Sequence, residues 1–197
     1  MSYYLVFDTE TTGLPKMAGW NQYFSSKRHT DKYDTSRVIQ LAWSVHDSET
    51  HDIISESSYY INQEGRSIPE GSTKIHGITD DVCEQKGLPF EEVFGLFIAD
   101  VKTSSLLIAH NISFDYNVIL SELYRRTMDS EILDFVALDK TCTLRMKKRK
   151  PKKLTLMYKS FFGEDFENAH DALADVRATA KCFAHMKDKL QYPVEYL

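Results

Sequence analysis

The chain opens on an apolar, strand-forming run that ends in two carboxylates. Residues 3–7 (Tyr-Tyr-Leu-Val-Phe) precede Asp8 and Glu10, and Gly13 and Pro15 follow. Aromatic and β-branched residues favour strands and Gly and Pro end them, so a buried strand is predicted. Side chains alternate along a strand, which puts both acids on one face. Two such acids indicate either a divalent-cation site, because hard cations bind carboxylate oxygens, or a solvated strand end.

Length and composition limit the class of protein. A chain of 197 residues suits one α/β domain, which we assign to residues 1–190, with 191–197 as a tail. The net charge of −5 argues against coating nucleic acid by bulk charge, but not against a local basic site. We expect no signal peptide and no membrane span. Widely spaced Cys83, Cys142 and Cys182 make zinc or a disulfide framework unexpected and favour a reducing, cytoplasmic location.

The pattern of elements predicts a mixed sheet. Residues 38–45 and 53–61 read as strands that form an antiparallel meander with the first strand. Residues 16–37 have no clear period and are predicted to be a long loop or insertion. Further strands are predicted at 106–109 and at 135–138, the second followed by a short helix. Helices are predicted at 79–87, 89–101, 113–127, 153–162 and 171–190, with one helical turn in the loop 69–77. This order implies an α/β fold with helices on the faces of the sheet.

Two later segments also carry acids where an element begins. In residues 110–115 a buried strand turns through His-Asn into a helix, with Asp115 in its first turn. In residues 170–175 a helix starts beside His170, and Asp175 lies about one turn in. Each alone fits capping or turn chemistry. Ligands gather at such edges of α/β sheets, so these acids and the two of the first strand together predict a site for two cations.

The three segments together resemble the exonuclease motifs of the DEDDh family. These DnaQ-like 3′→5′ exonucleases have the ribonuclease H-like fold and include DNA-polymerase proofreading subunits. The resemblance runs from about residue 3 to 185 and includes Ile-His-Gly-Ile-Thr at 75–79. It implies a five-stranded mixed sheet with helices on both faces, and a role in DNA proofreading or repair. The insertion 16–37 is longer than the tight turn of the shortest family members, although insertions there are familiar, and a basic run at 145–153 is not part of the family signature.

The resemblance also implies a two-metal hydrolysis that releases nucleoside 5′-monophosphates. The implied cofactors are two Mg²⁺, for which Mn²⁺ substitutes. The implied metal ligands are Asp8, Glu10, Asp115 and Asp175, with Asp8 as the bridge between the ions. His170 is implied as the general base, because imidazole accepts a proton near neutral pH. The implied substrate-binding residues are Thr11, Thr12, Gly13, Leu14, His110, Asn111 and Phe114, of which Phe114 fits base contact and core packing equally.

The basic run supports a second set of expectations. Lys147, Lys148, Arg149 and Lys150 fit a phosphate-binding patch, a solvated face or a nuclear localisation signal. The expected partners are single-stranded or 3′-ended DNA and a DNA polymerase, with no membrane. No side chain separates DNA from RNA. Two other functions fit the same fold: a non-catalytic nucleic-acid-binding or polymerase-associated scaffold, and a hydrolase of very short oligonucleotides.

Overall fold

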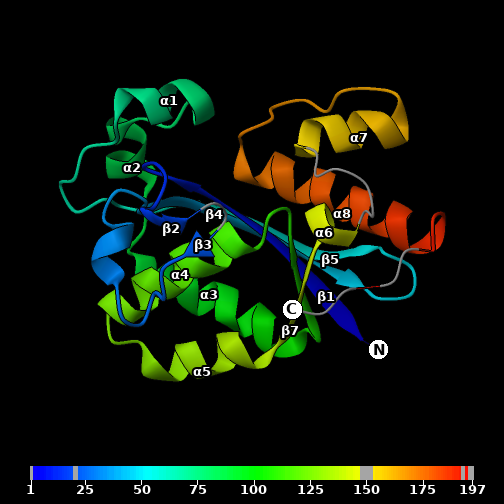
Figure 1. The fold of residues 1–197 in the computed structure, drawn as a ribbon, viewed down its shortest axis with the longest axis horizontal. Helices are drawn as coiled ribbons and strands as arrows, with labels where there is room; N and C mark the ends of the chain where they lie inside the picture. The colour runs from blue at the N-terminus through cyan, green and yellow to red at the C-terminus, as the bar shows by residue number, and fades with distance from the viewer. Residues whose placement is uncertain (1, 20–21, 147–152, 192–193, 195–197) are drawn as a thin grey trace.

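A five-stranded mixed sheet forms the centre of the computed structural model, which describes residues 2–19, 22–146, 153–191 and 194 (Figure 1). Its strands, in spatial order, are β5 (Ile53–Tyr60), β4 (Val38–Asp47), β1 (Tyr3–Thr11), β6 (Leu106–Ala109) and β7 (Asp139–Cys142). β1 is antiparallel to β4 and β4 to β5, as the meander predicted, whereas β6 and β7 are parallel to β1. The expected mixed α/β fold is confirmed.

Helices cover both faces of this sheet. In Figure 1, α3 (Phe90–Thr103), α4 (Ser113–Arg125) and α5 (Asp129–Ala137) lie below it, and α7 (Leu154–Phe162) and α8 (Ala172–Asp188) lie above it. The remaining helical elements are the 3₁₀ helix η1 (Thr30–Tyr33) and the short helices α1 (Glu70–His76), α2 (Asp80–Lys86) and α6 (Thr143–Met146).

The alternation of β1 decides which side chains meet which helices. Leu5 and Phe7 point into the core shared with α3, α4 and α5. Tyr4 and Val6 point into the core on the opposite face, where α8 packs. Asp8 follows Tyr4 and Val6 on the same face of β1, after the apolar run has ended. Its side chain is therefore on the side of the sheet where α8 packs.

Local signals set most helix boundaries where they were expected. The hydroxyl of Thr79 accepts a hydrogen bond from the backbone N–H of Val82 and caps α2. Gly163 ends α7 in the left-handed conformation that glycine adopts without strain. The predicted apolar face of α3 is buried along its whole length.

The prediction of a strand at residues 135–138 is wrong. These residues end α5, in which Ile132 and Phe135 lie three positions apart and turn to the core, and the strand β7 begins only at Asp139. A short apolar run does not distinguish helix from strand until its packing partners are known. The long loop predicted at 16–37 also contains more structure than expected, namely a hairpin of β2 (Met17–Gly19) and β3 (Gln22–Tyr23), followed by η1.

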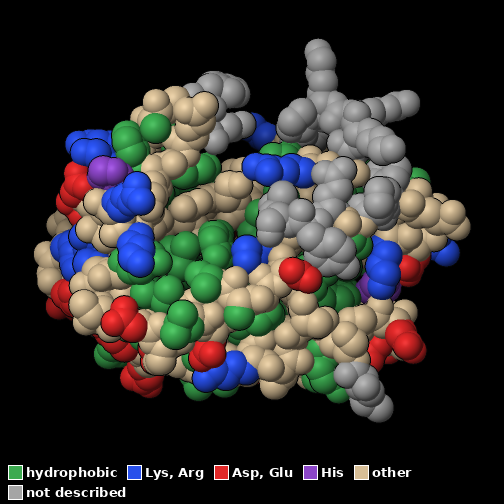
Figure 2. All heavy atoms as spheres, turned by 60° about the horizontal axis from the view of Figure 1, so that its bottom comes forward, with side chains coloured by type: hydrophobic (Ala, Val, Ile, Leu, Met, Phe, Trp, Pro, Cys, Tyr) green, Lys and Arg blue, Asp and Glu red, His purple; other side chains and the backbone are tan. Residues whose placement is uncertain are grey.

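The surface mixes charges of both signs. Figure 2, which turns the lower side of Figure 1 toward the viewer, shows Lys, Arg, Asp and Glu side chains around a group of hydrophobic ones. Exposed hydrophobic side chains on α3 and α5 include Leu96, Leu133 and Val136. Within the described part of the chain, no helix has the length and apolar character needed to cross a membrane. The basic patch predicted at Lys147, Lys148, Arg149 and Lys150 lies outside the described residues.

Candidate active site

Four carboxylates and one imidazole from three distant segments converge at the end of β1. Asp8 and Glu10 lie in β1, Asp115 in the first turn of α4, and Asp175 in the first turn of α8. The parallel pairing of β1 with β6, in which Val6 lies opposite Ile108, brings the end of β6 and the start of α4 to the same edge. The predicted convergence of these acids therefore occurs.

A polar bridge fixes the start of α8 against β4. Gln40 lies opposite Glu10 in the β1–β4 register. Its amide donates to Oδ2 of Asp171 at 3.2 Å and its carbonyl oxygen accepts from the backbone N–H of Ala172, also at 3.2 Å. Asp171 in turn caps the helix through Oδ1, which accepts from the N–H of Ala174. This bridge sets where Asp175 enters the site.

Thr9 holds Asp115 in place from the middle of the first motif. Its backbone N–H and its hydroxyl both donate to Oδ1 of Asp115, at 3.1 and 2.7 Å. Asp115 is 2% exposed, so these bonds partly offset the cost of burying its charge. Sequence reasoning missed Thr9 and Gln40 as positioning residues. Thr9 offered one signal, its place between the two acids of β1, whereas the role of Gln40 depends on strand register.

The acids raise one another's pKa values. Burial, followed by Asp115, Asp175 and Glu10, raises the pKa of Asp8 well above its usual range. Burial and then Asp175 raise the pKa of Glu10 to about 8. Burial raises the pKa of Asp115 to about 7, against the opposing effect of the Thr9 bonds. Burial also raises the pKa of Asp175 to about 6, although a backbone hydrogen bond from His170 lowers it. Such a cluster is unstable as four anions and stable with cations.

The donor set fits a hard divalent metal. Glu10, His170 and Asp175 each place a ligand atom within 4.8 Å of the other two. Oδ1 of Asp175 is buried without a hydrogen-bond partner, although buried polar atoms nearly always have one. A cation would satisfy this oxygen, and carboxylate oxygens suit Mg²⁺ or Mn²⁺.

The turn after β1 is tied to the insertion. The hydroxyl of Thr11 donates to the carbonyl of Gly13 at 2.8 Å, and that of Thr12 donates to the carbonyl of Thr35 at 3.2 Å. A Cβ on Gly13 would lie 2.9 Å from the carbonyl oxygen of Thr35, so a larger residue would not fit at this position without a shift of the backbone. Leu14 projects from this turn and is 77% exposed. Of the predicted substrate-binding residues here, Leu14 has its side chain most available.

The turn between β6 and α4 forms another side of the site. Nδ1 of His110 lies 2.9 Å from the hydroxyl of Thr143, which joins this turn to α6. Asn111 has a left-handed backbone, with φ of 69°, which asparagine tolerates, and its side chain is exposed. Phe114 is half-buried and packs against the core beneath α4. His170 likewise has a left-handed backbone and an exposed side chain.

Comparison with known proteins places these residues in a family. A family model described as "RNase_T: Exonuclease" matches residues 5–183. DNA polymerase III subunit epsilon of Buchnera aphidicola subsp. Acyrthosiphon pisum (strain APS) is 29% identical over 187 residues, which are 92% of this chain and 71% of that protein. DNA polymerase III PolC-type of Clostridium perfringens (strain 13 / Type A) is 31% identical over 195 residues, but the match covers 95% of this chain and only 12% of that protein.

Solved structures share the fold. E. coli Exonuclease I in complex with a dT13 oligonucleotide has a TM-score of 0.72 at 20% identity, covering 97% of this chain and 42% of that one. The nuclease domain of 3′hExo, a DEDDh family member bound to rAMP, also has a TM-score of 0.72, at 15% identity, covering 100% of this chain and 96% of that one. At these identities the likeness concerns the fold.

Proposed function

The chain belongs to the RNase_T exonuclease family, and from that premise we propose that it is a metal-dependent 3′→5′ exonuclease. The observation that carries the proposal is the meeting of Asp8, Glu10, Asp115 and Asp175 beside His170, at the end of β1. A scaffold without activity has no need for four mutually repelling acids at one buried edge. This cluster therefore favours catalysis over the non-catalytic alternative.

The four carboxylates would hold two Mg²⁺, with Mn²⁺ as a substitute. Asp8 is proposed as the shared ligand, since its pKa is raised by each of the other three acids. When bound, such ions make a water more acidic and stabilise the charge on the leaving oxygen. The bonds from Thr9 keep Asp115 oriented for this role.

His170 is proposed as the general base. Its imidazole is exposed at the start of α8 and has a ring nitrogen within 4.8 Å of ligand atoms of Glu10 and Asp175. It takes a proton from the attacking water as the new O–P bond forms and the bond from phosphorus to the 3′-oxygen breaks. The 3′-oxygen then takes a proton from solvent. The products are a nucleoside 5′-monophosphate and a shortened chain with a 3′-hydroxyl.

The turn of Thr11, Thr12, Gly13 and Leu14 is proposed as the seat of the 3′-terminal nucleotide. Leu14 is the candidate wedge against the last base, because its side chain projects from a turn braced by the insertion. His110, Asn111 and Phe114 form the opposite side.

The proposed substrate is a single-stranded 3′ end of DNA. The similarity to DNA polymerase III proteins supports DNA as the substrate and, by extension, a DNA polymerase as a partner. The structural relatives hold dT13 in one case and rAMP in the other, so RNA belongs in the test. An enzyme that trims the 3′ ends of DNA strands works where DNA is kept, and an intracellular, cytoplasmic location is part of the proposal.

The test is hydrolysis of 5′-labelled single-stranded DNA, single-stranded RNA and duplex DNA by the purified chain with Mg²⁺. We expect a ladder that shortens from the 3′ end, and loss of at least ~10³-fold in rate for Asp8→Ala, because a shared metal ligand is removed. Chelation by EDTA gives the same loss.

The matched control is Asp81→Asn, which removes an exposed acid from the first turn of α2. It should hydrolyse at the wild-type rate. Equal activity in wild type and Asp8→Ala would contradict the proposal. Activity confined to oligonucleotides of two to five residues would favour the short-oligonucleotide hydrolase.

A further inference from the structure

The segment 16–37 packs along α4, from Asn117 near the start of that helix to Arg125 at its end. The hydroxyl of Ser26 donates to the backbone carbonyl of Asn117 at 2.9 Å. The hydroxyl of Tyr33 donates to the carbonyl of Phe24 at 2.6 Å and closes the segment on itself. Arg125, from the end of α4, donates to the carbonyl of Thr30 at 3.0 Å. Two of these bonds attach the segment to α4, and the third lies within the segment.

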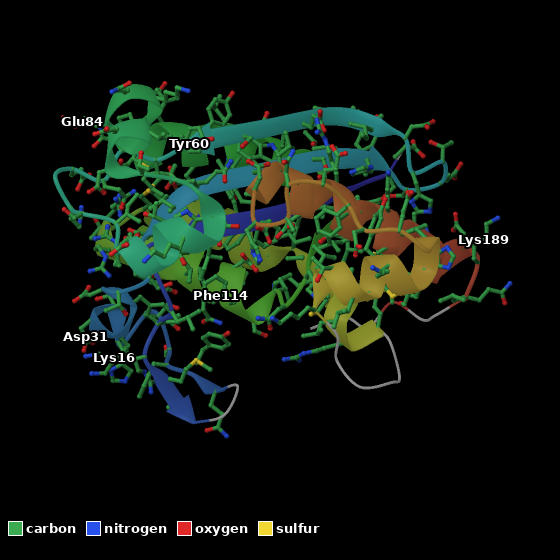
Figure 3. The ribbon with its side chains drawn as sticks, turned by 90° about the horizontal axis from the view of Figure 1, so that it is seen from above. Lys16, Asp31, Tyr60, Glu84, Phe114 and Lys189 are labelled. Carbon is green, nitrogen blue, oxygen red and sulfur yellow. The ribbon has the colours of Figure 1, made fainter. Side chains whose placement is uncertain are left out.

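The hairpin of this segment reaches the candidate site. Tyr23 in β3 lies opposite Met17 in β2, and β3 packs against α4. Burial raises the pKa of Tyr23, and the nearby side chain of Asn111 lowers it. Tyr23 is half-buried, and its ring borders the turn before Asp115. Its hairpin partner Met17 is 39% exposed. Figure 3 shows the hairpin projecting from the body of the molecule, with Lys16 near its base and Phe114 at the start of α4.

A cation lies on the other side of the same turn. Arg145 in α6 is exposed, and its guanidinium donates to the hydroxyl of Ser113 at 3.3 Å. α6 is joined to the turn through the 2.9 Å contact between Thr143 and His110. The turn before α4 and the first residue of that helix therefore have Tyr23 of the hairpin as one neighbour and α6 as another.

The insertion has the charge that a polynucleotide would attract. Residues 16–37 contain five Lys and Arg residues and two Asp residues, in a chain of net charge −5. Of the five cations, Arg37 is buried against Glu122. Lys16, by contrast, is exposed immediately after the turn that carries Leu14. Aromatic rings among exposed cations are typical of surfaces that bind single strands by stacking and by phosphate contacts.

We propose that the β2–β3 hairpin and α6 are the two sides of a track for the single strand upstream of its 3′-terminal nucleotide. In this track Tyr23 stacks on a base, and Lys16 and Arg145 contact phosphates. The inference rests on the proposed exonuclease function, since the track continues from the catalytic acids. It assigns to residues 16–37 a role in holding longer chains and not in the chemistry.

Binding of a 5′-fluorescein-labelled oligothymidylate of about 12 nucleotides, measured by anisotropy, tests the track directly. All binding variants carry Asp8→Ala, so that the strand is not consumed. Lys16→Gln/Arg145→Gln should weaken binding about 10-fold and lower the slope of log K against log salt by about 1.4, for two lost phosphate contacts. Tyr23→Ala should weaken binding about 10-fold without changing the slope, and Tyr23→Phe should retain the affinity.

The matched control is Lys86→Gln/Lys189→Gln, which removes the same charge from exposed positions. Lys189 lies at the opposite end of the molecule from Lys16 (Figure 3). The control should bind like its parent, and thermal melting checks that every variant folds. Unchanged affinity and slope in Lys16→Gln/Arg145→Gln, or an equal loss in the control, would overturn the track.

A second measurement separates this inference from the proposed function. With Asp8 intact, the ratio of kcat/KM on the longer strand to that on a dinucleotide should fall about 10-fold in Lys16→Gln/Arg145→Gln. An unchanged ratio would count against the track. A wild-type chain that binds the strand through these residues but hydrolyses neither substrate would refute the exonuclease and support the track.

Discussion

At the residue scale, the site depends on groups that orient its acids as well as on the acids themselves. Thr9 points away from the face of Asp8 and Glu10, yet it supplies two of the bonds that fix Asp115. Neighbours of metal ligands set ligand orientation, and their loss typically costs 10- to 100-fold in metal affinity. Thr9, which lies between Asp8 and Glu10 in the sequence, is thus a positioning residue for Asp115.

Thr9→Val tests this role. Valine keeps the shape and the strand preference but removes the hydroxyl, so Asp115 loses its shorter bond and its pKa rises further. We expect about 10-fold weaker Mg²⁺ binding by calorimetry. Thr9→Ser, which keeps a hydroxyl, is the control and should bind nearly as well as wild type. Equal affinities in all three proteins would contradict the assignment.

At the element scale, a buried ion pair joins α4 to the end of the insertion, immediately before β4. The guanidinium of Arg37 contacts both carboxylate oxygens of Glu122, at 2.5 and 2.8 Å, and Arg126 also bonds to Glu122. Burial alone would raise the pKa of Glu122, but the two arginines hold it below its usual range. The backbone N–H of Arg37 donates to the hydroxyl oxygen of Thr12, so this pair also supports the turn proposed to hold the terminal nucleotide.

Glu122→Gln should lower the free energy of unfolding by about 3 kcal/mol, because it leaves a buried guanidinium without its charge partner. Urea unfolding measures this. The double variant Arg37→Met/Glu122→Leu should lose less than Glu122→Gln, since it removes both charges. As a control, Glu70→Gln breaks the exposed Glu70–Lys74 pair and should change stability by no more than ~0.5 kcal/mol. Similar losses of unfolding free energy in Glu122→Gln and Glu70→Gln would show that the buried pair stabilises the fold no more than an exposed pair does.

At the scale of the whole molecule, the acidic cluster links folding to pH and metal. In the folded chain the pKa values of Glu10, Asp115 and Asp175 are about 8, 7 and 6, against ~4 in an unfolded chain. The folded state therefore binds more protons than the unfolded state between about pH 4 and 8. It follows that the cluster's contribution to stability is present at low pH and is lost as pH rises through this range.

Bound metal should reverse that loss, because cations replace the protons between the carboxylates. We expect the rise in Tm produced by Mg²⁺, relative to EDTA, to be several degrees at pH 8 and close to zero at pH 5. Because Tm with Mg²⁺ is compared with Tm in EDTA at the same pH, the titration of groups outside the site affects both values equally. Asp8→Ala should abolish most of the difference. A Mg²⁺ effect that is equal at both pH values would refute the linkage.

Sequence reasoning predicted that these acids would converge because its signals are local. Alternation along a strand placed Asp8 and Glu10 on one face, and capping preferences placed Asp115 and Asp175 at helix starts. The strand predicted at 135–138 failed because the choice between helix and strand there depends on what Phe135 packs against. The sequence also identified the insertion as a departure from the shortest family members. It did not predict the hairpin and the 3₁₀ helix that the insertion forms.

By itself, then, the sequence predicted most of the order of elements, the family and the five residues of the candidate centre. Only the tertiary structure decided that Gln40 bridges to α8, that Thr9 holds Asp115, and that Tyr23 reaches Asn111. The physical reason is range. Periodicity and capping act within a few residues, whereas these contacts join positions 88 to 131 residues apart. They form only once strand register and helix packing have fixed both ends.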